Sequence, residues 1–180
     1  HICAPKNKWE LSDMLKFAVG FNAPIAIRYP RGEAYDGLAQ FRAPVEYGKA
    51  EMIYEEEGIA LLAVGSMVST AEHIRQKLKA EGRSCTLANG RFVKPFDREL
   101  VDRLADQHKV IVTLEENVLQ GGYGLQVTAH IHEHYPHRRV LNIGLPDAYV
   151  EHGNVSVLRE GLGIDSDSII KTMKSRGYLD

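Results

Sequence analysis

The sequence predicts an α/β fold: a mainly parallel sheet with one antiparallel edge strand and helices on both faces. From about residue 47, short apolar runs alternate with segments of helical period, the order that builds right-handed crossovers between parallel strands. The predicted strand at 109–117 begins with the almost continuously apolar run "VIVTL", as in a strand buried on both faces. Two strand candidates flank the "EEEG" turn within 48–65 and predict a hairpin that adds the antiparallel edge strand.

The first 29 residues predict one helix and one strand. Asn7 followed by Glu10 is a variant of the capping box, and "PIAIRY" at 24–29 is the strand. Residues 7–21 are the helix, because apolar side chains recur on one helical face: Leu11, Met14, Leu15, Ala18 and Val19. These two elements bury too little surface for a core, so residues 1–32 are expected to be a remnant of another α/β domain. Residues 33–45 lack a clear period and are expected to form a linker.

Residues 46–180 are expected to form the main domain. Asp97 is the expected cap of one helix. Strands are predicted at 48–54, 58–65, 84–89, 109–117 and 139–147. Helices are predicted at 67–82, 98–108, 121–134, 154–161 and 166–175.

Composition limits the class of protein. The 180 residues carry 22 Lys and Arg against 24 Asp and Glu, a net charge of −2, which gives no reason to expect nucleic acid or an anionic membrane as a partner. Apolar runs stay well below the ~20 residues of a membrane span. Cys3 and Cys85 match no metal spacing, so reduced thiols in a cytoplasm are expected. The chain begins with His rather than Met and without a secretory signal, so a fragment of a longer polypeptide is expected.

Candidate binding residues lie at the predicted carboxyl ends of strands, where ligands gather in parallel sheets. Ser66, between a strand and a helix, is either a weak anion site or a plain helix cap. In "RFVKPFD", Arg91, Lys94 and Asp97 are predicted to lie in a loop, where salt bridges that order the loop are favoured over ligand binding.

The string "LEENVLQGGYG" brings two carboxylates, Glu115 and Glu116, to the end of a buried strand before a glycine-rich turn. Paired carboxylates perform acid–base chemistry when their pKa values are split. They also order a loop or dimer contact by accepting hydrogen bonds from backbone amides. With no nucleophile or histidine nearby in sequence, the structural role is favoured.

The string "HIHEHYPH" contains four histidines between His130 and His137. His130 and His134 are four residues apart on the predicted helix, a spacing that can chelate zinc or nickel. A solvent-facing helix end is the favoured alternative, since histidine also suits the negative end of the helix dipole. No metal site is therefore assigned.

The strand end "RYPRG" places Arg28 and Arg31 around Pro30. Two interpretations stay open from the residues alone: solvent-facing charge, or an anion site at the edge of a sheet. The chain lacks G-x-G-x-x-G, Walker A and G-x-S-x-G motifs, so the sequence contains no complete catalytic apparatus and no catalytic residue is assigned.

Five strings in this order, "RYPRG", "FVKPFD", "EEN", "GGYG" and "NIGLPD", resemble the C-terminal third of the 1-deoxy-D-xylulose-5-phosphate synthase family, within the transketolase superfamily. The resemblance covers nearly the whole chain. It implies that residues 1–32 are the tail of a pyrimidine-binding domain, 33–45 a linker, and 46–180 a transketolase C-terminal-like domain.

The resemblance also implies a function. Such enzymes condense pyruvate with D-glyceraldehyde 3-phosphate, releasing CO2, with thiamin diphosphate and Mg²⁺ as cofactors, and supply isoprenoid and thiamin precursors. It implies a cytoplasmic homodimer in which Arg31 binds the acceptor phosphate, with a domain-interface salt bridge as the alternative for Arg31. Arg28 is expected to form a structural pair. The family's cofactor and catalytic residues lie upstream, so none is carried onto this chain, and the chain alone is expected to be inactive. The alternatives are half of another transketolase-like enzyme and a non-catalytic binding module.

Overall fold

A five-stranded sheet forms the centre of the molecule. The computed structural model describes residues 1–179. The sheet runs in the order β3 (Glu51–Tyr54), β5 (Cys85–Asn89), β4 (Ile59–Ala63), β7 (Val110–Val118) and β8 (Arg139–Leu145). All neighbouring pairs are parallel except β3 with β5, so the predicted fold class is confirmed.

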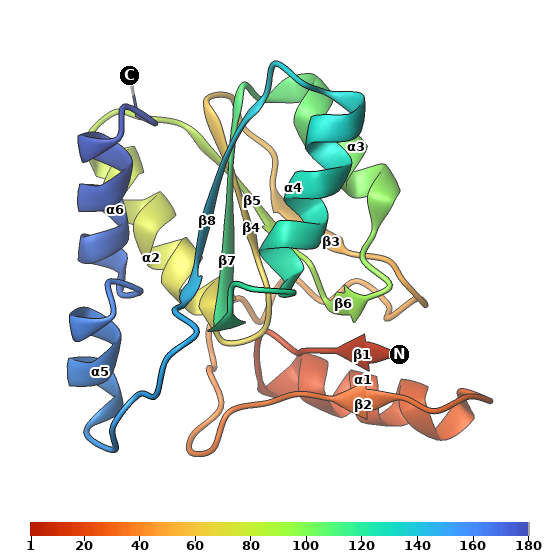
Figure 1. Cartoon of the computed structure of the whole chain (residues 1–180). Helices are drawn as coiled ribbons and strands as arrows, with labels where there is room; N and C mark the ends of the chain where they lie inside the picture. The colour runs from red at the N-terminus through yellow and green to blue at the C-terminus, as the bar shows by residue number, and fades with distance from the viewer. Residues whose placement is uncertain (180) are drawn as a thin grey trace.

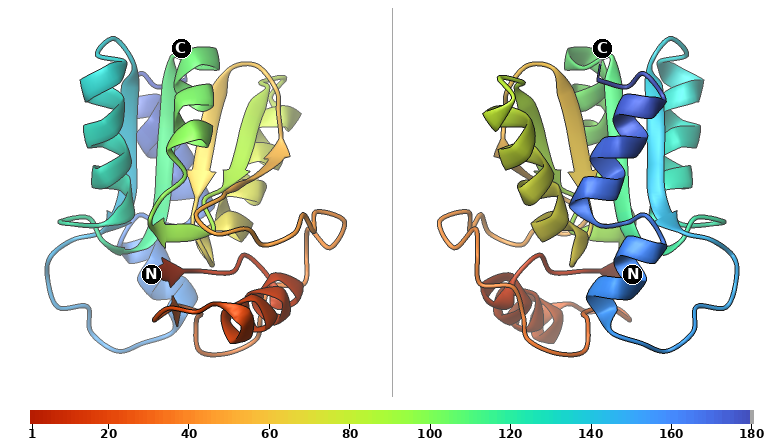
Figure 2. Two further views of the ribbon diagram at one scale, coloured as in Figure 1. Left: turned by 90° about the vertical axis from the view of Figure 1, so that its right-hand side faces the viewer. Right: turned by 90° about the vertical axis from the view of Figure 1, so that its left-hand side faces the viewer.

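Helices cover both faces of this sheet (Figures 1 and 2). On one face lie α2 (Met67–Ala80) and α6 (Ser166–Ser175), and on the other α3 (Arg98–Gln107) and α4 (Tyr123–His134). Successive residues of β4 point to opposite faces, so Leu61 packs with α2 and α6 while Leu62 packs with α3 and α4. This two-sided burial explains why β4 and the first half of β7 lack polar alternation.

The predicted hairpin is wrong, although β3 is the antiparallel edge strand. β3 pairs with β5, with Met52 opposite Ala88, and does not pair with β4. Both edges of β4 are occupied by the parallel neighbours β5 and β7, which bury all five of its residues. β3 alternates between buried and half-exposed positions, the pattern of an edge strand with one solvated face.

A second, small sheet was predicted only in part, since one of its three strands lies within the strand predicted at 24–29. It joins β2 (Ala26–Ile27), β1 (Ile2–Cys3) and β6 (Phe92–Lys94). The segment "RFVKPFD" is therefore not only a loop, because three of its residues form the strand β6, which pairs with the N-terminal strand β1. Strands β1 and β6, of two and three residues, carry too little periodicity to be predicted, and their distant partners determine them.

The predicted linker, residues 33–45, packs against the main domain. Leu38 is 7% exposed and belongs to the core under α2 and α6, and Tyr35 and Phe41 pack against that core. Because these side chains are packed against the core, residues 33–45 follow a fixed path between the N-terminal part of the chain and the main domain.

The parallel strands all end at one edge of the large sheet. The N-terminal elements α1 (Lys8–Gly20), β1 and β2 lie beyond this edge, to the right in Figure 1, and α5 (Val155–Gly161) lies beyond it on the left. The C-terminus lies near the opposite edge. The carboxyl edge therefore faces the N-terminal part of the chain.

Candidate functional site

The carboxyl edge of the large sheet brings together two of the strand ends singled out from the sequence and the helix α5. Glu116, in β7, accepts a hydrogen bond from the Ser66 hydroxyl at 2.5 Å. Arg159, from α5, binds the same carboxylate with both Nε (3.1 Å) and Nη2 (2.7 Å). This two-pronged geometry fixes the orientation of both side chains.

Ser66 does not cap helix α2, so the capping interpretation is wrong. Its side chain makes no capping hydrogen bond and its backbone is already helical, because its hydroxyl is turned toward Glu116. Burial alone would raise the pKa of Glu116, but the bonds from Arg159 and Ser66 and the charges of Arg159 and Arg28 lower it. Glu116 is therefore held as an anion, and the site presents no free general base here.

Glu115 performs the backbone-binding role that the sequence favoured. Its side chain is fully buried and accepts the amides of Tyr123 (3.0 Å) and Gly124 (2.8 Å) at the start of α4. Burial raises the pKa of Glu115, against the opposing effect of these amides. The two neighbouring carboxylates thus have pKa values shifted in opposite directions, but Glu115 is closed off from solvent and serves to position α4.

The glycines of "GGYG" are required by this arrangement. A Cβ atom on Gly122 would lie 2.6 Å from Oε1 of Glu115, and one on Gly124 would lie 2.5 Å from Oγ1 of Thr113. Both distances are too short for any side chain.

A buried cluster of charged residues joins the N-terminal part of the chain to this edge. Lys6 bridges Glu10 at 3.1 Å and Glu51 at 2.6 Å. Arg91 binds the same two carboxylates, at 2.7 Å and 3.1 Å. Asn89, at the end of β5, donates to both oxygens of Glu10 at 3.0 Å. We call these five residues the buried network.

Each charge in the buried network is matched by an opposite one. All four charged side chains are at most 3% exposed, and an unpaired charge at such a position would be strongly destabilising. Although burial of Glu10 acts to raise its pKa, the charges of Lys6 and Arg91 lower it overall. Arg91 also donates to the carbonyls of Pro44 and Ala43, which fixes the end of the segment 33–45.

The sequence analysis found only part of this network. It gave Arg91 a salt-bridge role and Glu10 a capping role, but it missed Lys6 and Glu51. The salt bridges of Arg91 reach distant elements instead of ordering its own loop. Lys94 is exposed, and Asp97 caps α3 as predicted, through the amide of Leu100.

Arg31, the predicted substrate-binding residue, lies in the turn after β2. It is exposed, and within residues 1–179 its side chain makes no hydrogen bond or ion pair. Arg28 is half-buried and likewise forms no side-chain ion pair in this part of the chain, so the expected structural pair is absent. Its charge nevertheless acts on Glu115 and Glu116, which places it at the carboxyl edge.

The histidine tract does not assemble a metal site. His130 contacts Asp102 of α3 through Nε2 at 2.7 Å, and His134 contacts the carbonyl of His130 through Nδ1 at 2.9 Å. Among residues 1–179, no group of three or more His, Cys, Asp or Glu side chains is arranged to hold a metal ion. The tract links α4 to α3 instead.

Comparison with known proteins identifies the domain. A family model described as "Transketolase, C-terminal domain" matches residues 48–169. The chain belongs to the transketolase C-terminal domain family. The large sheet, its helices and the carboxyl edge described above fall almost entirely within the matched residues.

The similarity to curated relatives also covers the N-terminal part of the chain, which lies outside the matched domain. The chain is 46% identical over 178 residues to the 1-deoxy-D-xylulose-5-phosphate synthase of Lachnoclostridium phytofermentans, and 39% identical over 178 residues to that of Heliobacterium modesticaldum. Each match covers 98% of this chain and 28% of the relative. The chain thus spans little more than a quarter of the length of these relatives, and the resemblance stated from the five strings is confirmed.

Solved structures share the whole fold. A protein titled "Split gene transketolase, inactive beta4 tetramer" superposes with a TM-score of 0.90 at 25% identity, over 99% of this chain and 58% of that one. The transketolase of Campylobacter jejuni superposes with a TM-score of 0.62 at 16% identity, over 97% of this chain and 26% of its own. The N-terminal elements are therefore placed against this domain in the same way in other solved structures.

Replacing Arg91 by Met should lower the free energy of unfolding by about 3–5 kcal/mol, because the substitution leaves Glu10 and Glu51 buried with fewer partners. Urea unfolding monitored by circular dichroism measures the loss. Arg42→Met is the matched control, because it removes an arginine from a solvent-exposed pair with Asp13, and it should cost much less. Equal losses for the two variants would contradict the importance given to the buried network.

The buried network should also make stability depend on pH. The pKa of Glu10 lies below 4.5 in the folded chain, so its contribution is present above pH 4.5 and is lost as the pH falls through the lower, folded-state value. The free energy of unfolding should fall below pH 4.5 in the wild-type chain and fall less steeply in Glu10→Gln. Glu99→Gln, which removes a carboxylate 85% exposed, should leave the slope unchanged, and a slope unaltered by Glu10→Gln would contradict the prediction.

Gly122→Ala should destabilise the chain by about 1–3 kcal/mol, because its Cβ would collide with Glu115 and displace the start of α4. Gly161→Ala is the control, since no atom lies within 4 Å of the added Cβ, and it should leave stability unchanged or slightly raised. Thermal unfolding of both variants measures the difference. Similar melting temperatures for the two would show that Glu115 does not require the close approach.

Proposed function

We propose that the chain forms the C-terminal part of a synthase that condenses pyruvate with D-glyceraldehyde 3-phosphate, giving 1-deoxy-D-xylulose 5-phosphate and CO2 for isoprenoid and thiamin precursors. The observation that carries the proposal is the 46% identity, over 98% of this chain, to the protein of that name from Lachnoclostridium phytofermentans. Membership of the transketolase C-terminal domain family supports a transferase of the thiamin-dependent type.

In this proposal Arg31 binds the phosphate of the aldehyde acceptor. Its guanidinium is exposed and has no partner among residues 1–179, so it is available to an anion. Guanidinium offers phosphate a rigid pair of donors. Gly32, at φ +112°, permits the turn that carries Arg31 beyond β2.

Thiamin diphosphate and Mg²⁺ are assigned to the synthase as a whole and to no residue of this chain. The residues that the structure describes offer no cluster of acidic or histidine ligands suited to a cation. Of the helices within residues 1–179, none combines the length and apolar character that crossing a bilayer requires. We further propose a cytoplasmic homodimer, in which this domain contributes to assembly and the chain alone is inactive.

A second candidate is a subunit that pairs with a separately encoded N-terminal partner. The observation that favours it is the TM-score of 0.90 with a protein titled a split gene transketolase. The identity to that protein is 25% against 46% to the synthase, so the synthase is the better supported of the two.

The proposal is tested by joining this chain to the N-terminal part of the Lachnoclostridium phytofermentans synthase, in place of the residues it matches. Arg31→Ala in this chimera should lower kcat/KM for D-glyceraldehyde 3-phosphate roughly 30-fold, which corresponds to the loss of a charged hydrogen bond of about 2 kcal/mol. The loss with unphosphorylated glyceraldehyde should be much smaller. Formation of the product is followed by mass spectrometry.

Arg98→Ala, which removes an exposed arginine from α3, is the control and should leave both rates unchanged. An equal effect of Arg31→Ala on the two acceptors would contradict the binding of the acceptor phosphate by Arg31. A folded chimera without synthase activity would contradict the proposed reaction.

A further inference from the structure

Two carboxylates and three arginines come together at the carboxyl edge of the large sheet, and only some of them are paired. Glu115 is closed off from solvent and accepts backbone amides. Glu116 is bound by Arg159, whose Nη2 lies at 2.7 Å and whose Nε lies at 3.1 Å. Within residues 1–179, the side chains of Arg28 and Arg31 form no hydrogen bond or ion pair. Two of the three arginines at this edge are therefore available to an anion.

Arg28 lies beside the turn that leads to the Glu116 pair. Its amide donates, at 2.8 Å, to the carbonyl that precedes Ala4, because β2 runs parallel to β1. Ala4 in turn lies against Gly65, since a Cβ atom added to Gly65 would be 3.2 Å from the Cβ of Ala4. The residue after Gly65 is Ser66, whose hydroxyl donates to Glu116 at 2.5 Å. Arg28 and the Glu116 carboxylate therefore belong to the same part of the edge.

The charge of Arg28 acts on Glu116 although the two side chains form no ion pair. Burial tends to raise the pKa of Glu116, but the hydrogen bonds from Arg159 and Ser66 and the charges of Arg159 and Arg28 lower it overall. A carboxylate that is partly buried needs a partner, and guanidinium is a strong one. If Arg159 were absent, Arg28 would be the arginine in position to take its place.

We propose that Arg159 is a positioning residue for the acceptor phosphate: by occupying the Glu116 carboxylate, it keeps Arg28 and Arg31 free to bind that phosphate. The proposal rests on the proposed function, in which Arg31 binds the phosphate, and it adds Arg28 to the same anion site. It also explains why a carboxylate is tolerated at an edge that binds an anion, since the charge of Glu116 is neutralised from α5.

The effect of Arg159 is electrostatic. Without it, Glu116 either places an uncompensated negative charge beside the phosphate or draws Arg28 to itself. Both results weaken the binding of an anion, because like charges repel and because a paired arginine offers fewer donors. An uncharged acceptor is indifferent to both. The selection of a phosphorylated acceptor therefore depends on an arginine that does not touch the phosphate.

Inorganic phosphate is the first probe, titrated into the 180-residue chain and followed by NMR of the arginine Nε–Hε groups. Phosphate should shift the resonances of Arg28 and Arg31 and leave that of Arg159 in place. Arg159→Met should weaken phosphate binding about fivefold, the upper range for a partly exposed ion pair. The double variant Arg159→Met with Glu116→Gln should bind phosphate as tightly as the wild-type chain, because the competing charge is also removed.

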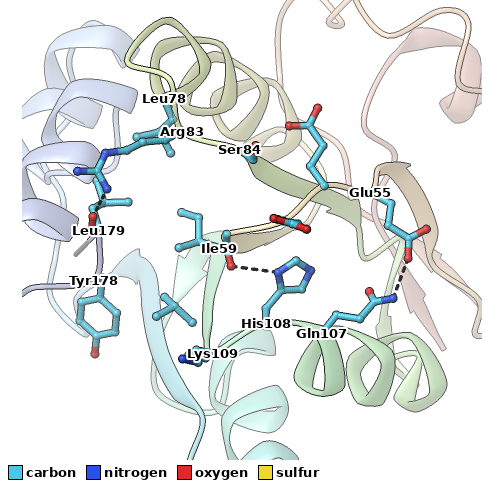
Figure 3. Close-up of a pocket in the computed structure, with 14 residues that line it drawn as sticks. Glu55, Ile59, Leu78, Arg83, Ser84, Gln107, His108, Lys109, Tyr178 and Leu179 are labelled. Carbon is cyan, nitrogen blue, oxygen red and sulfur yellow. Dashed lines mark hydrogen bonds between the residues drawn. The ribbon is translucent and has the colours of Figure 1, made fainter.

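Glu116→Gln alone separates this role from a merely structural one. Each single variant breaks the pair that fixes α5, so a structural role predicts equal losses of phosphate binding, whereas the proposal predicts a loss for Arg159→Met only. Because α5 has no buried residue, its release should not unfold the chain. Arg103→Met is the matched control and should leave phosphate binding unchanged. Arg103 binds Glu55 with two nitrogens at the opposite edge of the sheet, where Figure 3 shows Glu55 beside Gln107.

The same variants in the chimera show whether the role extends to the reaction. Arg159→Met should raise KM for D-glyceraldehyde 3-phosphate about fivefold, with kcat and the KM for unphosphorylated glyceraldehyde unchanged. Equal losses in Arg159→Met and Glu116→Gln, no recovery in the double variant, or a wild-type chain in which phosphate shifts neither Arg28 nor Arg31 would overturn the proposal. A chimera without synthase activity would contradict the proposed function instead, and the phosphate titration would still decide the role of Arg159.

Discussion

The pairing of Lys6 and Arg91 with Glu10 and Glu51 is the interaction on which the relation between the two parts of the chain depends. These residues come from the N-terminal segment, from β3 and from the end of β5, and their side chains are almost completely enclosed. Buried charges are tolerated only with partners in good geometry. The elements that carry them therefore have few alternative positions.

The buried network also constrains the backbone conformation of Arg91. Arg91 lies at φ +50°, a conformation that is unfavourable for a residue with a side chain. Its backbone amide and guanidinium make four hydrogen bonds, to Asn89, Glu10, Pro44 and Ala43, and the guanidinium also forms an ion pair with Glu51. These interactions offset that cost. The residue just after it, Phe92, begins the strand β6 that pairs with β1. The strained turn thus connects the charge network to the small sheet.

The buried network matters for function because it decides where Arg28 and Arg31 lie. The small sheet and the buried network hold β2 beyond the carboxyl edge, so that Arg28 and Arg31 follow it there. From the other side, Arg159 is fixed at the same edge by the Glu116 carboxylate. The edge therefore presents arginines from two distant parts of the sequence. Among these arginines, the side chain of Arg31 makes no hydrogen bond or ion pair within residues 1–179. In the proposed synthase this is the group left available for an acceptor phosphate.

Much of the main domain could be predicted because its signals are local. The helix at 98–107 has its Asp97 cap and its apolar face within one short stretch, and the strand at 110–118 has a continuous apolar run. The order of such elements was enough to predict a parallel sheet. The hairpin was predicted wrongly because adjacency in sequence gave no information on which edge of the sheet was free, and β5 occupied the place beside β4.

The sequence by itself determined the alternation of strands and helices and the buried character of β7, and it favoured a structural role for the pair Glu115 and Glu116 over acid–base chemistry. Only the tertiary structure decided that Lys6 and Glu51 complete the buried network and that Ser66 binds Glu116 instead of capping a helix. The physical reason is the range of the interactions. Hydrophobic period and capping act over a few residues, whereas ion pairs and cavities are made by side chains that only the folded chain brings together.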